Sequence, residues 1–171
     1  MNQMKKWILL IVFLSISISI ADEAGKGTLT SIGQPVPAFS VVCISGEEYN
    51  IEQLRGKVVL INFFATWYAP CMVEMPELEK QIWQRYKNED FVVISIGREH
   101  TTKQLKKFNK KKKFSFPIAA DPDRKIYSLF AGQYIPRNYL IDKHGRIVYQ
   151  SIGFDQNEFG VLLKTIENEL K

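Results

Sequence analysis

The chain has 171 residues, of which 46% are hydrophobic and 24% charged, with ten glycines, seven prolines and two cysteines. These proportions describe one ordinary globular domain and exclude a collagen-like, a low-complexity or a disulfide-dense protein. Twenty-three basic against eighteen acidic residues give a formal net charge of +5. This excess is too small to indicate nucleic acid or an acidic membrane as a partner.

The first 21 residues have the order of segments of a secretory signal peptide. Lys5 and Lys6 precede an uncharged apolar run, residues 7–20, and Ala21 ends it before two acidic residues. A helix of that run would be about 21 Å long, shorter than the roughly 30 Å of a bilayer's hydrocarbon core. We therefore expect cleavage after Ala21 and export to the periplasm or the extracellular space. An uncleaved N-terminal membrane anchor is the alternative.

The segment after the leader predicts a lead-in, a hairpin and a central strand. Residues 22–35 are small and polar, with three glycines, and predict a flexible lead-in to a domain over residues 36–171. Two apolar stretches within residues 39–51, separated by a turn, predict a short hairpin. Residues 58–64 are almost continuously apolar, which is typical of a strand covered on both faces at the centre of a sheet.

The remaining chain alternates between helices and strands. After Pro70, apolar residues recur at three- and four-residue intervals and predict an amphipathic helix to about Lys87, kinked at Pro76. The elements expected beyond it are a buried strand at 91–96, a basic helix at 103–113, a short helix near 126–130, a hairpin of strands 137–141 and 146–152, and a helix at 154–170. This order predicts an α/β protein with a mixed sheet and helices on both faces.

The most specific motif lies where the central strand meets its helix. Residues 62–76 read Asn-Phe-Phe-Ala-Thr-Trp-Tyr-Ala-Pro-Cys-Met-Val-Glu-Met-Pro. They resemble the thioredoxin-like superfamily, in particular its exported TlpA and ResA branch, where a buried strand precedes Ala-x-Trp-Cys-x-Pro-Cys and a later Pro. Residues 134–145 resemble the family's cis-proline loop, strand and hairpin, and residues 56–60 resemble the start of its central strand. The resemblance spans about residues 33–170 and implies a thioredoxin-like fold with an N-terminal β-hairpin extension.

The resemblance implies thiol-disulfide exchange, yet the chain departs from the motif at its first cysteine. In the family this thiolate, whose pKa is lowered at a helix N-terminus, attacks a target disulfide, and the second cysteine resolves the mixed disulfide. Tyr68 stands in the first position here. A phenol is only about 0.1% ionised at neutral pH, and its oxygen cannot form a disulfide. We therefore predict negligible two-cysteine reductase activity.

Two further residues match catalytic positions of the family. Cys71 takes the place of the resolving thiol, and it is either a single reactive thiol or a small buried apolar side chain. A disulfide between Cys43 and Cys71 is a third option. Glu74 matches an acidic residue that the branch places near its cysteines to assist proton transfer. Its alternative is a solvated first-turn carboxylate stabilised by the helix dipole.

A peptide-binding surface is implied by the same resemblance. Pro136 matches the cis-proline, whose loop leaves a backbone edge open to an extended protein or peptide partner. Arg137 replaces the Thr common there, and its charge either favours an acidic partner or points to solvent. Tyr134 is expected beside this surface, as an exposed aromatic or as mere packing. The candidate binding residues are Trp67, Tyr68, Pro70, Ile135 and Pro136.

Other signals predict few additional partners. Seven lysines within residues 103–113 are typical of a solvated helix face, with an acidic partner or anionic lipid headgroups as the alternative. His100 and His144 are isolated, and neither has the spacing of a metal ligand. No cofactor motif occurs. We expect no metal, no cofactor and no nucleic acid, and contact with a membrane only if the leader is uncleaved.

Three interpretations of function remain open. The first is a thioredoxin-family protein with a degenerate site, kept as a binding or chaperone-like module. The second is a single-thiol oxidoreductase working through Cys71, with or without Cys43; exposure of Cys71 favours this one and burial favours the first. The third, a peroxiredoxin-like peroxidase, needs a cysteine at Tyr68 and a threonine at Ala65, and the chain has neither.

Overall fold

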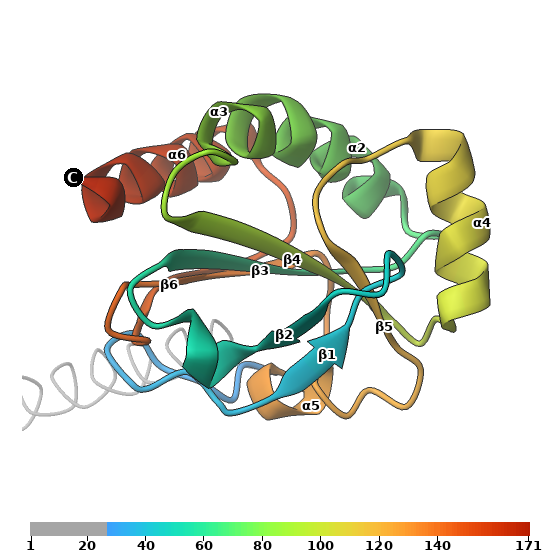
Figure 1. Cartoon of the computed structure of the whole chain (residues 1–171), viewed down its shortest axis with the longest axis horizontal. Coiled ribbons are helices and arrows are strands. Elements are labelled where there is room, and N and C mark those ends of the chain that lie inside the picture. Colours follow the sequence, from blue (N-terminus) through green and yellow to red (C-terminus); the bar gives the residue numbers. More distant parts are fainter. Residues whose placement is uncertain (1–26) are drawn as a thin grey trace, which may run out of the picture.

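A computed structural model describes residues 27–171 (Figure 1), and the predicted signal peptide lies outside these residues. Five strands form the central sheet in the order β5-β4-β3-β6-β7. β3 pairs parallel with β4 and antiparallel with β6, so the predicted mixed sheet is confirmed. The strands are β3 (Val58–Phe64), β4 (Phe91–Arg98), β5 (Ile118–Asp121), β6 (Arg137–Ile141) and β7 (Ile147–Ile152).

The central strand is buried along its whole length, as its apolar sequence predicts. All seven residues of β3 are buried, because a strand lies on each side of it and helices cover the faces of the sheet. Asn62 is its one polar residue. A buried amide needs hydrogen-bond partners, so this position already marks a polar site inside the sheet.

Helices cover both faces of the sheet. Figure 1 shows α2 (Ala69–Glu77), α3 (Gln84–Tyr86) and α6 (Gln156–Leu170) along one face, and α5 (Tyr127–Phe130) on the other. The hairpin of β1 (Ser40–Val42) and β2 (Glu48–Asn50), followed by the 3₁₀ helix η1 (Ile51–Leu54), lies on the α5 side as the predicted extension.

The predicted helix after Pro70 is present, but it is not α-helical throughout. Pro76 lies inside α2 and has no backbone N–H to donate. The chain continues after α2 as a π-helical segment, η2 (Leu78–Trp83), before α3 restores the α-helical pattern. Such π-helical turns are rare, and most of them occur inside an α-helical run, as this one does. The helical run ends at Tyr86, close to the predicted end.

The described part of the lead-in is attached to the domain. Leu29 N–H donates to Phe130 O at 2.9 Å, and Gly33 N–H donates to Ile147 O at 2.7 Å. Ile147 N–H in turn donates to Gln34 O at 3.0 Å. These bonds hold residues 29–34 beside α5 and along the outer edge of β7.

The basic helix is α4 (Thr102–Lys112), beside β5 in Figure 1. A capping box begins it: Gln104 N–H donates to Thr101 Oγ1 at 3.3 Å, and Thr101 N–H donates to Gln104 Oε1 at 2.8 Å. Its lysines are exposed, as expected for a solvated face. Across residues 27–171, no helix combines the length and the hydropathy needed to cross a membrane.

Candidate functional site

The motif around Tyr68 and the cis-proline loop meet at one end of the sheet. Phe63, near the end of β3, pairs in register with Arg137, the first residue of β6. Residues 65–68 connect β3 to α2, and residues 131–136 lead into β6. The Ile135–Pro136 peptide bond is cis, as the resemblance implies.

Exposed aromatic side chains surround this end of the sheet. Trp67 is 65% exposed, Tyr134 55% and Tyr68 38%. The rings of Trp67 and Tyr68 meet edge to face with centroids 5.9 Å apart. Pro70 is half-buried, whereas Ile135 and Pro136 are buried. Pro136 has no backbone N–H, and its carbonyl accepts from Gly153 N–H, so at the cis bond only the backbone of Ile135 is left for a partner.

Tyr68 occupies the position immediately before α2. Its backbone is extended, with φ −98° and ψ 116°, and its side chain makes no capping hydrogen bond. Its carbonyl oxygen accepts from Met72 N–H at 3.2 Å, so the helix starts here. Pro70 suits the first turn, where a missing N–H costs no helical hydrogen bond.

Cys71 lies beneath this turn and is 0% exposed. Burial raises the pKa of its thiol to about 12; the backbone of Ala65 and the charge of Arg98 lower it only partly, and Glu74 raises it further. Cys43 is also buried, and burial with the nearby Glu47 raises its pKa to about 12. Both thiols are free, so no disulfide joins them. This environment favours Cys71 as a buried apolar side chain over a reactive thiol.

Neither thiol is expected to react in the folded protein. With a pKa of about 12, roughly one thiol in 10⁵ is ionised at neutral pH, and the sulfur is also covered. A chromogenic aromatic disulfide should therefore detect no thiol in native protein and two after denaturation. Rapid labelling of one thiol in the native state would contradict this, and Cys71→Ser and Cys43→Ser variants would identify which.

Glu74 is buried and lies in the second turn of α2, so the alternative of a solvated first-turn carboxylate is wrong. It is 1% exposed, and its pKa is raised to about 7 because burial outweighs the hydrogen bonds that favour the charged form. Those bonds come from Asn138 Nδ2 to Oε1 at 2.6 Å and from Asn62 Nδ2 to Oε2 at 2.9 Å. Both donors lie on strands of the sheet, β6 and β3, so the Glu74 side chain faces the sheet.

Glu74 accepts hydrogen bonds from a row of polar side chains that crosses four neighbouring strands. Asn62 is in register with Ser95 on one side and Asn138 on the other, and Asn138 is in register with Ser151. Ser95 Oγ donates to Asn62 Oδ1 at 2.7 Å, and Asn62 Nδ2 also donates to Asn138 Oδ1 at 3.0 Å. A water-sized cavity of about 10 Å³ adjoins Glu74 and reaches Glu158 of α6. These side chains form a buried hydrogen-bonded network, which we call the polar row.

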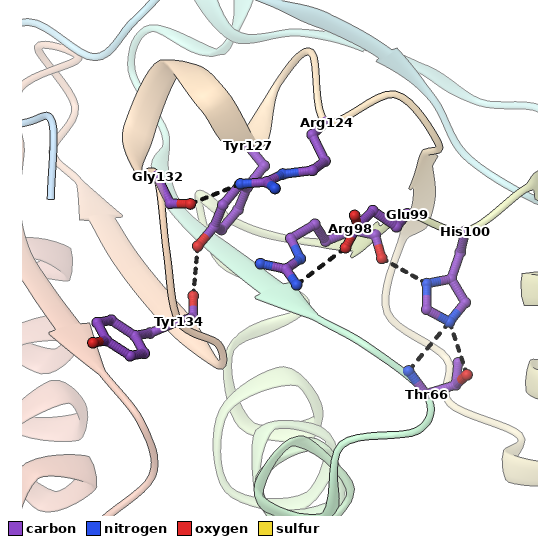
Figure 2. A network of polar contacts seen from close by, with 8 residues as sticks. All are labelled: Thr66, Arg98, Glu99, His100, Arg124, Tyr127, Gly132 and Tyr134. Carbon is purple, nitrogen blue, oxygen red and sulfur yellow. Dashed lines mark hydrogen bonds and ion pairs between the residues drawn. The ribbon is translucent and has the colours of Figure 1, made fainter. Parts of the chain in front are cut away.

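Three consecutive carbonyls fix the loop before the cis-proline. Gly132 O accepts from Arg124 Nη2 at 2.7 Å, and Tyr134 O accepts from Tyr127 Oη at 2.6 Å (Figure 2). Gln133 O, between them, accepts from Arg137 Nε at 2.9 Å. Tyr134 adopts φ 66°, a left-handed conformation that is uncommon for a residue with a side chain. The loop is therefore held in one shape by donors from outside it.

His100, which looks isolated in the sequence, holds the other loop of the site. Its Nδ1 lies 2.7 Å from Arg98 O, and since a carbonyl can only accept, Nδ1 carries the hydrogen. Nε2 then accepts from Thr66 N–H at 3.3 Å, and it lies 2.8 Å from Thr66 Oγ1 (Figure 2). This contact fixes the chain just before Trp67. Its partners are 34 residues apart, so no local spacing indicates it.

Removing one donor from the cis-proline loop should weaken the fold measurably. Tyr127→Phe leaves Tyr134 O without its hydrogen bond, and we expect the free energy of unfolding to fall by about 1 kcal/mol. Tyr68→Phe is the matched control, because the hydroxyl of the half-exposed Tyr68 makes no hydrogen bond within residues 27–171. Urea denaturation of both variants is the measurement, and equal midpoints would contradict a structural role for the Tyr127 hydroxyl.

Arg137 points into the protein, so the expectation that it faces solvent is wrong. It is 1% exposed. Its Nη1 donates to Thr28 Oγ1 at 2.9 Å and to Tyr139 Oη at 3.3 Å. The partner from the lead-in is 109 residues away, which explains why the sequence does not reveal the burial. Among the described residues, no three His, Cys, Asp or Glu side chains are grouped to hold a metal ion.

Comparisons with known proteins agree with this geometry. The AhpC/TSA family model matches residues 32–150. The thiol-disulfide oxidoreductase ResA of Bacillus anthracis is 33% identical over 127 residues, covering 74% of this chain and 73% of that protein. ResA of Bacillus subtilis (strain 168) is 27% identical over 141 residues, covering 82% and 78%.

Solved structures give the same result for the fold. A candidate protein disulfide isomerase from Bacteroides thetaiotaomicron is 34% identical, with a TM-score of 0.81 over 85% of this chain and 93% of that one. A candidate thiol:disulfide interchange protein DsbE from Chlorobium tepidum is 26% identical, with a TM-score of 0.72 over 82% and 99%. The thioredoxin-like fold implied by the motifs is thereby confirmed. The chain belongs to the AhpC/TSA family and, within it, to the thioredoxin-like thiol-disulfide oxidoreductases of the ResA and DsbE type.

Proposed function

We propose that this chain is an exported member of its family with a degenerate site, which binds extended segments of partner proteins and has negligible disulfide reductase activity. The observation that carries the proposal is the absence of an accessible thiol: Tyr68 precedes α2, and Cys71 beneath it is fully buried. Exchange requires a sulfur that bonds to the target sulfur and releases the other as a thiolate. The phenol oxygen of Tyr68 cannot form a disulfide bond.

The cis-proline loop supports the binding role. The N–H and C=O of Ile135 have no hydrogen-bond partner among the described residues, although the flanking carbonyls of Tyr134 and Pro136 are both bonded. An unpaired N–H and C=O beside the cis bond can pair with an extended peptide. Because the loop is already held in one shape, binding need not order it, which lowers the cost of association. Trp67 and Tyr134 supply exposed aromatic surface on either side.

One assay separates this proposal from the oxidoreductase interpretation. When a small dithiol reduces insulin, the released B chain aggregates, and the turbidity reports the rate. A reductase accelerates the onset of turbidity, whereas a module that binds extended chains delays it. We expect the natural protein to delay it at a few equivalents. Acceleration would overturn the loss of catalysis, and an unchanged curve would overturn the binding role.

Matched variants locate the binding surface in the same assay. Trp67→Ala should shorten the delay, because it removes the most exposed aromatic side chain of the site. Leu129→Ala is the control, since Leu129 is an exposed apolar residue of α5 and lies outside the two loops. Equal effects of the two substitutions would show that binding is unspecific and not a property of the site.

Export is proposed from the leader in the sequence. The basic, apolar and small-residue segments of residues 1–21 support removal of the leader, which leaves a chain that starts at Asp22. The intact mass of protein purified from the producing cell tests this directly. A mass that includes residues 1–21 would support the membrane-anchored alternative.

A further inference from the structure

Arg137 is a buried cation that has no counterion within residues 27–171. Its Nε and Nη1 donate to neutral oxygens of Gln133, Thr28 and Tyr139, and its Nη2 has no partner among the described residues. No Asp or Glu oxygen within residues 27–171 lies within 4.0 Å of the guanidinium. Buried charges are ordinarily paired, because transfer of an ion out of water is costly. The side chain therefore has unused capacity for an anion.

A cavity of about 260 Å³ has Arg137 in its wall, and the unpaired Nη2 of this residue is itself buried. Thr28 and Ser151 bring hydroxyl groups to its wall, and Gln150 brings an amide. Gly27 lies next to the unpaired nitrogen: a Cβ there would lie 3.4 Å from Nη2 and 3.0 Å from Gln133 Cβ, so only a glycine fits at this point. The residues that line the cavity are Thr28, Arg137, Gln150, Ser151, Ile152 and Glu158.

The cavity lies beside the proposed peptide-binding edge. Arg137 is in register with Ile152, at the end of β7, and Gly153 N–H donates to Pro136 O at 2.8 Å. Ile135, with its unpaired backbone groups, is two residues from Arg137 across the cis bond, so their Cα atoms lie at most about 7 Å apart. A short side chain or a chain end of a bound peptide spans that distance.

We infer that Arg137 and this cavity form a subsite for a carboxylate of the bound peptide, so that the protein selects segments with an acidic residue or a free C-terminus. The inference rests on the proposed function for the identity of the ligand. A guanidinium matches a carboxylate through two parallel N–H donors, and one of them, Nη2, is buried here without a partner among the described residues. Glu158 in the wall repels a second negative charge, which favours a carboxylate over a phosphate dianion.

Small probes test the subsite without the rest of a peptide. N-acetylglycine carries a terminal carboxylate, and N-acetylglycinamide is its neutral counterpart. We expect saturable shifts of the Gly27, Thr28 and Gln133 amide signals with the first probe and none with the second. Inorganic phosphate should bind more weakly than N-acetylglycine. Equal shifts from both acetylated probes, or tighter binding of phosphate, would overturn the inference.

Variants of the full chain test whether the guanidinium of Arg137 is responsible for the binding of N-acetylglycine. Arg137→Gln should weaken N-acetylglycine binding by about tenfold or more, and Arg137→Lys should weaken it less, since it keeps the charge but loses the planar donors. Lys106→Gln on α4 removes an equally positive but distant charge and should leave binding unchanged. The amide spectrum of each variant checks that it is folded. Unchanged binding in Arg137→Gln would overturn the subsite.

A last variant distinguishes a partner's carboxylate from the chain's own. Asp22 and Glu23 precede the described residues in the sequence. If N-acetylglycine binds only after Asp22→Asn and Glu23→Gln, the chain itself fills the subsite and selection of an acidic partner is overturned. Binding to the natural chain supports it. The probe experiment needs no turnover and no aggregating substrate. It can therefore contradict the subsite while the insulin assay supports the proposed function, and it can support the subsite while the insulin assay contradicts the proposed function.

Discussion

Tyr68→Cys is expected to turn this chain into an active disulfide reductase. The new thiol would precede α2, where the free backbone N–H groups and the helix dipole lower the pKa of a cysteine. Cys71 lies one turn away, in the place where a second thiol can displace the product from the mixed disulfide. Two electrons from the added dithiol then return the resulting disulfide to its dithiol form. We expect insulin reduction to accelerate on the order of 100-fold.

Two companion variants show whether the gain comes from this chemistry. Tyr68→Ser opens the same space without a sulfur and should stay inactive. Tyr68→Cys combined with Cys71→Ser should accumulate a mixed disulfide with its target, because nothing resolves it. If the natural protein matches Tyr68→Cys in rate, then Cys71 or Cys43 carries exchange and the proposed function fails. If Tyr68→Cys is inert, the scaffold has lost more than its first thiol.

Stability is expected to fall as the pH rises from about 5 to about 8, because of Glu74. Its pKa is about 7 in the folded protein against 4.5 ordinarily, so between these values the folded chain keeps a proton that the unfolded chain has lost. The protonated fold is favoured at low pH, and this advantage is lost as pH rises toward 7. The shift corresponds to at most about 3 kcal/mol in the free energy of unfolding.

Urea denaturation at several pH values measures this slope. Glu74→Gln cannot titrate and should flatten the curve across the window. Glu52→Gln, an exposed carboxylate of η1, is the matched control and should keep the slope. Burial also raises the pKa of Glu158, which adjoins the same small cavity. The variant Glu158→Gln therefore measures how much Glu158 contributes to the pH dependence of stability. The same slope in Glu74→Gln as in the natural chain would contradict the assignment.

Most elements of this fold could be predicted because their signals are local, but the short strand β5 is not among the expected elements. The apolar run of β3 and the three- and four-residue spacing after Pro70 each identify an element within a few residues of sequence. The cis-proline at Pro136 follows from the family motif around it. These features also place the two loops of the site at one end of the sheet.

The environment of the polar residues could not be predicted in the same way. Glu74 lies in the second turn of α2, where its spacing suits either solvent or the core, and its burial depends on Asn62 and Asn138, 12 and 64 residues away. Arg137 depends on Thr28 in the lead-in, and His100 on Thr66. The tertiary fold brings each of these pairs together, and the partners are too far apart in the sequence for a local pattern to indicate them. The one signal in the sequence is Asn62, a polar residue in a strand otherwise built for the core.

The polar row has a consequence for how the strands find each other during folding. Sliding β6 by one residue along β3 would turn Asn138 to the opposite face, among the aromatic rings around Phe63, and would deprive Glu74 of a donor. Each buried polar group left unpaired costs about 1–3 kcal/mol. An all-apolar strand pair would tolerate such slippage far more readily. The polar row therefore specifies a single register between β3 and β6. This register keeps the cis-proline loop opposite Tyr68.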